Sequence, residues 1–483
     1  MRDVPKTQIL KRIEFENPWW DRPHEVPPNY TQWKPRPYLE LFYPLVENQN
    51  IRRAILLMGP RRVGKTVLIH HTISRLLQTI PPKQIVYFSI DHPLYNSLGL
   101  EQLLEFFGEV SGTDYKTTPT YVFYDEIQYL KDWEIHLKTL MDAFPAVKPI
   151  TSGSAAVALR LKSVESGAGR FTEFLLPPLT FHEYLTLLDS SEKPMPKLMR
   201  PKLSKGPNFS HAQDIEHLNK VFVDYLNYGG YPEVVFSADI QKDPGRFVKA
   251  DIVDKVLLRD LPSLYGIQDI QELNSLFTTL AFNTANEVSL EDLTQNSGVA
   301  KNTIKRYIEY LEAAFLLRVL HRVDQSGRRF RRANFFKVYL TNPSVYCALF
   351  APVKSHDESM GSLVETAIFS QWFHADISRF HYSRWPGGEV DMVFRGPESA
   401  IQWAMEVMWS DRFSEDSHKL KSSLRFCHSN DLRDMLVTSK QQQTSKVIDG
   451  VNFEFVPASE YCYTVGYNLV MGKKVFRPEQ NPS

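Results

Sequence analysis

Residues 54–72, AILLMGPRRVGKTVLIHHT, combine an apolar run, a glycine-rich turn and a helical pattern. The apolar run at 54–58 predicts a buried strand, and the apolar positions after residue 66 predict a helix. Between them the sequence fits G-x-x-x-x-G-K-[ST], in the strand–loop–helix context that this pattern needs. Backbone N–H groups of such a loop, and the positive end of the following helix, surround phosphate oxygens. We therefore predict a nucleotide-binding P-loop. The alternative, an ordinary glycine-rich turn before a helix, matches the full pattern much more rarely.

The residue types of this loop match the chemistry of a triphosphate. Lys65 can reach the β- and γ-phosphates, and the Thr66 hydroxyl can ligate Mg²⁺. ATP and Mg²⁺ are thus the expected ligands. The predicted nucleotide-binding residues are Gly59, Pro60, Arg61, Arg62, Val63, Gly64, Lys65, Thr66 and Val67.

Apolar strands alternate with helical patterns from residue 51 to about residue 188, which is typical of a parallel α/β sheet. One predicted strand, at 120–124, leads to Asp125 and Glu126. Ligands bind at this carboxyl end of the strands in such sheets. Asp125 suits the organisation of Mg²⁺, and Glu126 suits the orientation or deprotonation of an attacking water.

Two later segments supply candidates for contacts to the γ-phosphate. The strand predicted at 147–154 ends in small hydroxyl residues, of which Ser154 is the first choice and Ser152 the alternative. A serine-rich turn that caps the next helix explains them equally well. Arg170 is a candidate for stabilising the γ-phosphate charge, in the same chain or in a neighbouring subunit. A surface arginine is the simpler interpretation.

The composition fits a soluble protein of several domains. The chain has 483 residues, of which 43% are hydrophobic and 23% charged, and its formal net charge is zero. No apolar run approaches the length of a membrane span, and the first residues lack the layout of a secretion signal. The three cysteines are far apart and suggest neither a zinc site nor a disulfide framework. We expect a cytoplasmic protein without a membrane partner.

The chain resembles one group of prokaryotic AAA-type ATPases (ATPases associated with diverse cellular activities), near the archaeal-type ATPases. The resemblance rests on the P-loop, YDEIQ at 124–128, SGS at 152–154, GR at 169–170, PLTFHEYL at 178–185, YGGYPEV at 228–234 and LRDLP at 258–262. It extends over most of the chain and implies ATP binding by an AAA-type parallel sheet with a helical lid. It also implies a link to mobile DNA or phage defence.

The sequence predicts five parts. They are a proline- and aromatic-rich arm at 1–50, the ATPase core at 51–188, a basic loop and helical lid at 189–272, a winged helix-turn-helix at 273–345 and a small α/β nuclease-like domain at 346–483. We expect the arm to be extended with one short helix. Packing of Trp19 and Trp20 on the core is favoured over stacking on a base. For the loop at 190–211, a solvated insert is favoured over a nucleic-acid contact.

A helix–turn–helix pattern occupies residues 289–315. Ser289 is a plausible N-cap of the first helix, Gly298 lies at the turn, and 301–315 forms the second helix. A hairpin follows at 316–323 and 335–340. This order is what a winged DNA-binding module needs, because its second helix must fit the major groove.

Charge supports contact with double-stranded DNA. Residues 301–332 hold nine Lys or Arg against three acidic residues, a net charge of +6 in a chain whose total is zero. Such charges bind backbone phosphates, which dominate non-specific affinity. The candidate DNA-binding residues are Lys301, Asn302, Thr303, Lys305, Arg306, Arg328, Arg329, Arg331 and Arg332. The alternative is that the module connects proteins.

The C-terminal part resembles the PD-(D/E)xK nuclease fold, with the acids Glu365, Asp391 and Glu406. Such carboxylates would hold Mg²⁺ against a phosphodiester. The lysine of the pattern is replaced by Met408, whose thioether cannot donate a hydrogen bond or neutralise negative charge. Lys419 or Lys421 is a possible substitute. We predict a retained fold without cleavage.

The leading hypothesis is an Mg-dependent ATPase of AAA type coupled to DNA binding. A nucleotide-controlled switch or scaffold that binds a protein partner with little turnover is the alternative, and an ATP-regulated DNA endonuclease is the second. Whether the chain forms a homo-oligomer stays open.

Overall fold

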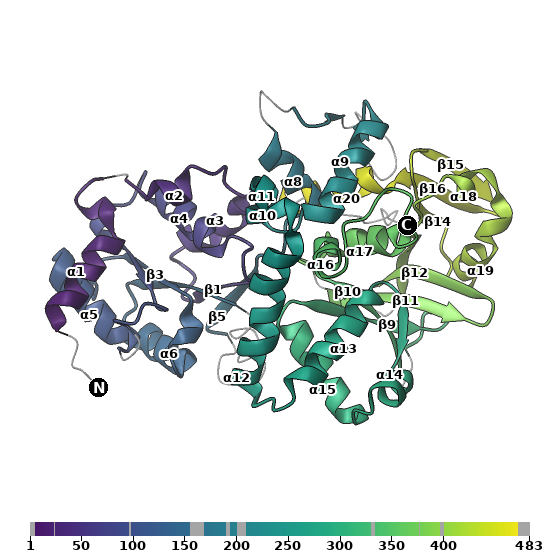
Figure 1. The fold of residues 1–483 in the computed structure, drawn as a ribbon. Helices are drawn as coiled ribbons and strands as arrows, with labels where there is room; N and C mark the ends of the chain where they lie inside the picture. Colours follow the sequence, from purple (N-terminus) through teal and green to yellow (C-terminus); the bar gives the residue numbers. More distant parts are fainter. Residues whose placement is uncertain are drawn as a thin grey trace. The chain divides into compact units, whose positions relative to one another are not determined.

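The computed structural model describes residues 5–23, 25–95, 98–154, 169–189, 194–199, 209–329, 334–375, 377–396 and 400–471. The chain divides into two compact units, Met1–Leu176 and Pro177–Ser483. Figure 1 shows the elements of each unit along the chain. In the described parts, no helix is long and apolar enough to cross a membrane.

The first unit contains a five-stranded sheet in the order β2-β3-β4-β1-β5, in which all paired strands are parallel. Its strands are β1 (Ala54–Met58), β2 (Ile85–Ser89), β3 (Thr120–Asp125), β4 (Val147–Gly153) and β5 (Phe171–Leu175). Every residue of β1, β3 and β4 is buried, as expected for a parallel sheet covered on both faces. The parallel α/β sheet and its predicted strands are therefore confirmed, and β4 lies between the P-loop strand and the acid strand.

Helices of the first unit surround this sheet. They are α1 (Lys6–Glu16), η1 (Pro18–Trp20), α2 (Pro28–Thr31), α3 (Leu39–Glu47), α4 (Lys65–Leu76), η2 (Pro82–Gln84), α5 (Leu100–Ser111), η3 (Ile127–Tyr129) and α6 (Trp133–Ala143). The arm is more helical than expected, because Ile9 and Ile13 lie one turn apart and bury one face of α1. The packing of both tryptophans on the core is confirmed, since each indole N–H donates to the carbonyl oxygen of Ile85.

The second unit is built on a nine-stranded mixed sheet in the order β15-β16-β14-β13-β12-β11-β9-β10-β8. Its strands are β8 (Glu287–Ser289), β9 (Leu317–Val323), β10 (Phe335–Leu340), β11 (Phe380–Trp385), β12 (Gly388–Arg395), β13 (Ile401–Glu406), β14 (Asp434–Ser439), β15 (Thr444–Ile448) and β16 (Val451–Pro457). A separate two-stranded pair joins β6 (Leu198–Met199) to β7 (His211–Ala212). Because β9 pairs in parallel with β11, the large sheet crosses the boundary expected near residue 345.

The remaining elements of this unit are helical. They are α8 (Phe181–Leu188), α9 (Ile215–Tyr228), α10 (Pro232–Phe236), α11 (Ala238–Lys242), the π-helical segments η5 (Gly245–Asp254) and η6 (Val256–Asp260), α12 (Leu261–Tyr265), α13 (Ile270–Phe282), α14 (Leu290–Ser297), α15 (Lys301–Ala313), α16 (Pro343–Leu349), α17 (Met360–Ser370), η7 (Ile377–Arg379), α18 (Arg412–Glu415), η8 (Ser417–Leu420), α19 (Lys421–Ser429) and α20 (Ala458–Val470). The part expected to hold a helical lid, at 189–272, is thus largely helical from residue 215 on.

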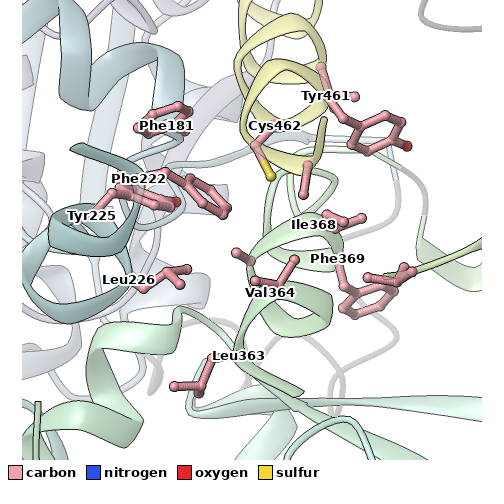
Figure 2. Packing of buried hydrophobic residues seen from close by; sticks show 14 of the residues in the cluster. Phe181, Phe222, Tyr225, Leu226, Leu363, Val364, Ile368, Phe369, Tyr461 and Cys462 are labelled. Carbon is pink, nitrogen blue, oxygen red and sulfur yellow. The ribbon is translucent and has the colours of Figure 1, made fainter. Parts of the chain in front are cut away.

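Alternating side chains of the large sheet supply two apolar cores. Met392 and Met405 face a cluster formed with α9, α17 and α20, whereas Val393 and Ala404 face a second cluster with α19. Successive strand residues point to opposite faces, so one sheet serves both cores. Figure 2 shows part of the first cluster, with side chains from α8, α9, α17 and α20 gathered together.

The predicted helix–turn–helix elements occur as α14 and α15. The Ser289 hydroxyl accepts the Asp292 N–H at 3.3 Å, which confirms this residue as the N-cap. Gly298 ends α14 with φ +71°, a left-handed conformation that glycine adopts without strain. The hairpin follows as β9 and β10, and β10 also pairs with β8.

Candidate functional site

The phosphate loop connects β1 to α4 and has the backbone geometry of an anion cradle. Gly59 permits a close approach, because a Cβ there would lie 2.2 Å from the carbonyl oxygen of Leu176. Arg62 and Gly64 have φ values of 65° and 90°. When residues of positive φ alternate with residues of negative φ, successive backbone N–H groups point into a concavity that suits phosphate oxygens.

Lys65 starts α4 with its ammonium inside the loop. Its Nζ donates to the carbonyl oxygens of Gly59 at 3.1 Å and Pro60 at 2.8 Å. Burial lowers the pKa of Lys65, while Glu126 and Asp125 oppose that shift. The charges of Lys65, Asp125 and Glu126 therefore lie close enough to influence one another.

Asp125 is the meeting point of three hydroxyl donors. Thr66 Oγ1 donates to Asp125 Oδ2 at 2.7 Å, and Tyr87 donates to the same oxygen at 2.9 Å. The Ser152 hydroxyl donates to the other oxygen, Oδ1. These bonds fix the carboxylate beside the threonine that the sequence assigned to Mg²⁺.

Glu126 follows in a strained position. Its φ of 55° lies in the left-handed region, which costs a non-glycine residue on the order of 1 kcal/mol or more. Its backbone N–H donates to Ser152 Oγ at 3.0 Å, and the Gln128 amide donates to its carboxylate. Burial raises the pKa of Glu126, and Lys65 opposes this.

The serines of β4 therefore have different partners. Ser152, the sequence alternative, contacts both acids, whereas the Ser154 N–H donates to Gln128 Oε1 at 3.3 Å. The Gln128 side chain therefore bonds both the Ser154 backbone N–H and the Glu126 carboxylate. The sequence analysis assigned no role to Gln128. A polar residue between Ile127 and Tyr129, two positions after Glu126, could have indicated a contact with that acid.

Residues of the N-terminal arm and of α4 complete the surroundings of the loop. Arg36, which is buried, donates to the carbonyl oxygen of Val63 at 2.8 Å. Tyr30 stacks on His70 with ring centroids 3.8 Å apart, and burial lowers the pKa of His70 to about 4. These contacts were missed, because nothing in the arm's sequence shows which part of the core it covers.

Arg170 does not reach the P-loop of its own chain. Its carbonyl oxygen accepts the Ala54 N–H, so it lies at the amino-terminal end of β1, and the loop lies at the other end. Its guanidinium pairs with Asp142 at 3.4 Å. Parallel pairing of β1 with β5 fixes this placement, so the prediction of a role in the same chain is wrong.

The residues at the carboxyl ends of β1 and β3 fit a triphosphate with Mg²⁺. The loop offers positive-φ residues and one ammonium, and Thr66 and Asp125 offer two oxygens that already lie within hydrogen-bond distance. Oxygen ligands from a hydroxyl and a carboxylate suit Mg²⁺, which usually takes few protein ligands. Glu126 lies next to this pair with a carboxylate held by Gln128.

The candidate DNA-binding face of α15 is only partly available. Asn302, Lys305 and Arg306 are exposed, on the side opposite to the buried Ile304 and Ile308. Thr303 is half-buried. Lys301 pairs with Glu291 at 2.7 Å, so its ammonium is engaged within the helix–turn–helix.

The basic hairpin does not present all of its charge to solvent. Arg328 and Arg329 are both exposed, and Arg329 also donates to His381 Nε2 at 2.8 Å and to the Ser378 carbonyl oxygen. Arg322 donates to the carbonyl oxygen of Arg384. Arg329 is therefore exposed but already bonded within the protein, and its contact with DNA phosphates stays a prediction. Arg331 and Arg332 lie outside the described residues.

The three acids assigned to the nuclease-like part come together. Glu365 of α17 and Asp391 of β12 both contact the ammonium of Lys337, and Glu406 of β13 hydrogen-bonds to Asp391. Lys337 comes from β10 and was not among the substitutes considered for Met408. Lys421 is exposed at the start of α19, and the side chain of Lys419 lies outside the described residues.

The sheet, the phosphate loop and the acid strand fit a P-loop core of the AAA type. Comparison with known families agrees, since residues 51–185 match a model described as an AAA domain. Residues 219–356 match a model described as a domain of unknown function (DUF8612). This class of fold supports ATP binding by the first unit.

Several proteins are similar over most of the chain. An uncharacterized protein of Haemophilus influenzae is 22% identical over 417 residues, which is 83% of this chain and 92% of that protein. An uncharacterized protein of Methanocaldococcus jannaschii is 24% identical over 333 residues, 67% of this chain and 68% of that protein.

Two solved structures resemble this chain with lower sequence identity. The ORC2 protein of Aeropyrum pernix, solved as ADPNP–ADP complexes, has a TM-score of 0.38 and 14% identity, covering 64% of this chain and 91% of that one. AMPPCP-bound DnaA from Aquifex aeolicus has a TM-score of 0.27 and 12% identity, covering 56% of this chain and 86% of that one.

Proposed function

We propose that this chain is an Mg-dependent ATPase of AAA type whose turnover is coupled to binding of double-stranded DNA. The observation that carries the proposal is the 2.7 Å hydrogen bond between Thr66 and Asp125, with Lys65 and Glu126 beside it. A role in mobile-DNA maintenance or phage defence is what the family resemblance implies for such a protein.

Each residue would then have one role in hydrolysis. The loop N–H groups and Lys65 bind the β- and γ-phosphates, and Thr66 and Asp125 hold Mg²⁺. When bound, Mg²⁺ neutralises charge that develops on the phosphate oxygens. Glu126 orients a water molecule and accepts its proton as the water oxygen bonds to the γ-phosphorus and the bond from this phosphorus to the leaving oxygen of ADP breaks. Catalysis is then mainly positioning and electrostatics. Arg170 remains a candidate only from a neighbouring copy.

DNA binding is proposed for the helix–turn–helix and hairpin at 289–340, used as a winged module. The exposed side chains of Asn302, Lys305 and Arg306 support contact of α15 with the major groove and its flanking phosphates, and exposed Arg328 supports a phosphate contact by the hairpin. Part of the cationic charge is bonded within the protein, since Arg322 is half-buried and bonds the Arg384 carbonyl oxygen, and the exposed Arg329 bonds His381. Moderate, salt-sensitive affinity is therefore expected.

The test is an ATPase assay of the wild type and Glu126→Gln, each with and without double-stranded DNA. We expect the wild type to hydrolyse ATP faster with DNA. Glu126→Gln should bind ATP with unchanged affinity and hydrolyse it about 10²- to 10⁴-fold more slowly, the usual loss of a positioned base. Normal hydrolysis by this variant would refute the role of Glu126. ATP binding without measurable turnover by the wild type would instead favour a nucleotide-controlled switch.

A further inference from the structure

Lys337 lies at the centre of the acidic cluster in the second unit. Its Nζ is 3.0 Å from Glu365 Oε1, 3.0 Å from Asp391 Oδ1 and 2.8 Å from Glu389 Oε1. The lysine belongs to β10 and the acids to α17 and β12. One ammonium therefore joins three carboxylates from two elements.

A bulge in the sheet directs Asp391 toward this lysine. In the pairing of β11 with β12, His381 faces Val393 and Ser383 faces Val390. Residues 391 and 392 thus both lie opposite Tyr382. Bulges of this type bend the strand locally and change the direction of a side chain. The backbone bulge in β12 therefore helps to position the Asp391 side chain for its contact with Lys337.

The acidic oxygens have partners within the protein. Tyr339 donates to Glu365 Oε1 at 2.6 Å, and the Val407 N–H donates to Asp391 Oδ2 at 2.9 Å. The Ser423 hydroxyl donates to Glu406 Oε1 at 2.7 Å. Burial, reinforced by Asp391, raises the pKa of Glu406 well above its usual range.

Lys337 itself is enclosed and charged. Its side chain is only 3% exposed. Burial acts to lower the pKa of Lys337, but Glu365 and Asp391 outweigh it and raise the pKa well above its usual range. A divalent ion bound by the same oxygens would lie close to this ammonium and be repelled by it. In the described parts of the chain, no group of three or more His, Cys, Asp or Glu residues is arranged to hold a metal ion.

We propose that Lys337 is a resident counter-ion that replaces the divalent metal in this nuclease-like centre. The Mg²⁺ that the resemblance to the nuclease fold implies does not fit here, because the ammonium already bridges the acids that would bind it. The centre then serves to hold β10, which follows the helix–turn–helix, to α17 and β12. DNA bound by this unit is not cleaved.

The test measures Mn²⁺ binding to the nucleotide-free full chain by electron paramagnetic resonance. The single variant Asp391→Asn should bind Mn²⁺ as the wild-type protein does. Lys337→Met removes the ammonium at similar volume, and we expect it to create a site that binds Mn²⁺ at least tenfold more tightly than the wild type does. This gain should disappear in Lys337→Met/Asp391→Asn. Lys446→Met is the matched control, since this strand lysine of the same sheet bonds the Ser414 carbonyl oxygen.

Other outcomes overturn the proposal. One is Mn²⁺ binding by the wild type that Asp391→Asn abolishes, and another is metal-dependent DNA cleavage lost in the same variant. A folded Lys337→Met protein with no additional Mn²⁺ site also overturns it. If Lys337→Met does not fold, the wild-type comparison with Asp391→Asn decides, and Lys337→Arg should fold and bind no additional Mn²⁺.

Discussion

The hydroxyl of Thr66 donates to Asp125 Oδ2 at 2.7 Å, although the two are 59 positions apart in the sequence. This contact joins the start of α4 to the end of β3, across β4. The parallel sheet brings the two together because both lie at the carboxyl end of their strands. The predictions for the first unit follow from this pair and its neighbours.

Asp125→Asn should remove most of the Mg²⁺ dependence of ATP binding. The amide has one acceptor oxygen and no charge, so it cannot serve the three hydroxyl donors as the carboxylate does. We expect the ratio of the ATP dissociation constants in EDTA and in Mg²⁺ to fall severalfold or more. Asp91→Asn, an exposed acid just after β2, is the control and should leave the ratio unchanged. An unaltered ratio in Asp125→Asn contradicts the assignment.

Gln128→Leu should slow hydrolysis without weakening ATP binding. Gln128 donates to the Glu126 carboxylate and accepts the Ser154 N–H, so its loss leaves Glu126 without this partner. One lost hydrogen bond of about 1 kcal/mol corresponds to a rate loss of about five- to tenfold. Steady-state turnover and nucleotide titration measure the two quantities. Gln102→Leu, at an exposed position of α5, should alter neither. An equal loss of affinity would argue for a structural role instead.

Arg36→Met should weaken ATP binding more than it slows turnover. The guanidinium holds the Val63 carbonyl oxygen, and thereby the shape of the phosphate loop. Loss of a charged hydrogen bond of about 1.5–3 kcal/mol predicts affinity that is at least tenfold lower. Titration with a fluorescent ATP analogue measures this change, and Arg52→Met at an exposed position is the control. Unchanged affinity would show that the loop keeps its shape without the arm.

The sequence predicted those parts of the site whose function depends on local spacing. The P-loop and the acid pair follow from a strand, a turn and a helix with residues at fixed intervals, and both are where the pattern put them. Ser152 could not be separated from Ser154, because the choice depends on register between β3 and β4. Lys337 and Arg36 were missed because the residues that they contact are far away in the sequence. No pattern in β10 or in the arm indicates which residues they will face.

Lys305→Ala combined with Arg306→Ala should weaken DNA binding and reduce its salt dependence. Both side chains are exposed on α15, and each lost phosphate contact lowers the slope of log K against log salt by about 0.9. The double variant should therefore lose up to about two units of slope. Fluorescence anisotropy with a duplex at several salt concentrations measures it. Lys220→Ala/Lys249→Ala, at exposed positions elsewhere in this unit, is the control. Equal slopes in both double variants would contradict contact through α15.

His381→Gln should make the second unit less sensitive to acid. Nε2 of His381 accepts the Arg329 guanidinium N–H at 2.8 Å, so the ring must be neutral for this bond to form. Burial, reinforced by Arg329, lowers the pKa of His381 to about 4 in the folded protein, from a usual value of about 6.5.

Because the folded pKa is the lower one, the unfolded chain takes up the proton first as the pH falls. The stability contribution of neutral His381 is thus complete above about pH 6.5 and is lost progressively toward pH 4. Glutamine can accept from Arg329 without titrating. Urea unfolding of the variant should therefore show a smaller fall of the midpoint between pH 7 and pH 5 than the wild type does. His418→Gln at an exposed position should match the wild type. A fall as large in His381→Gln as in the wild type would mean that Arg329 does not depend on this ring.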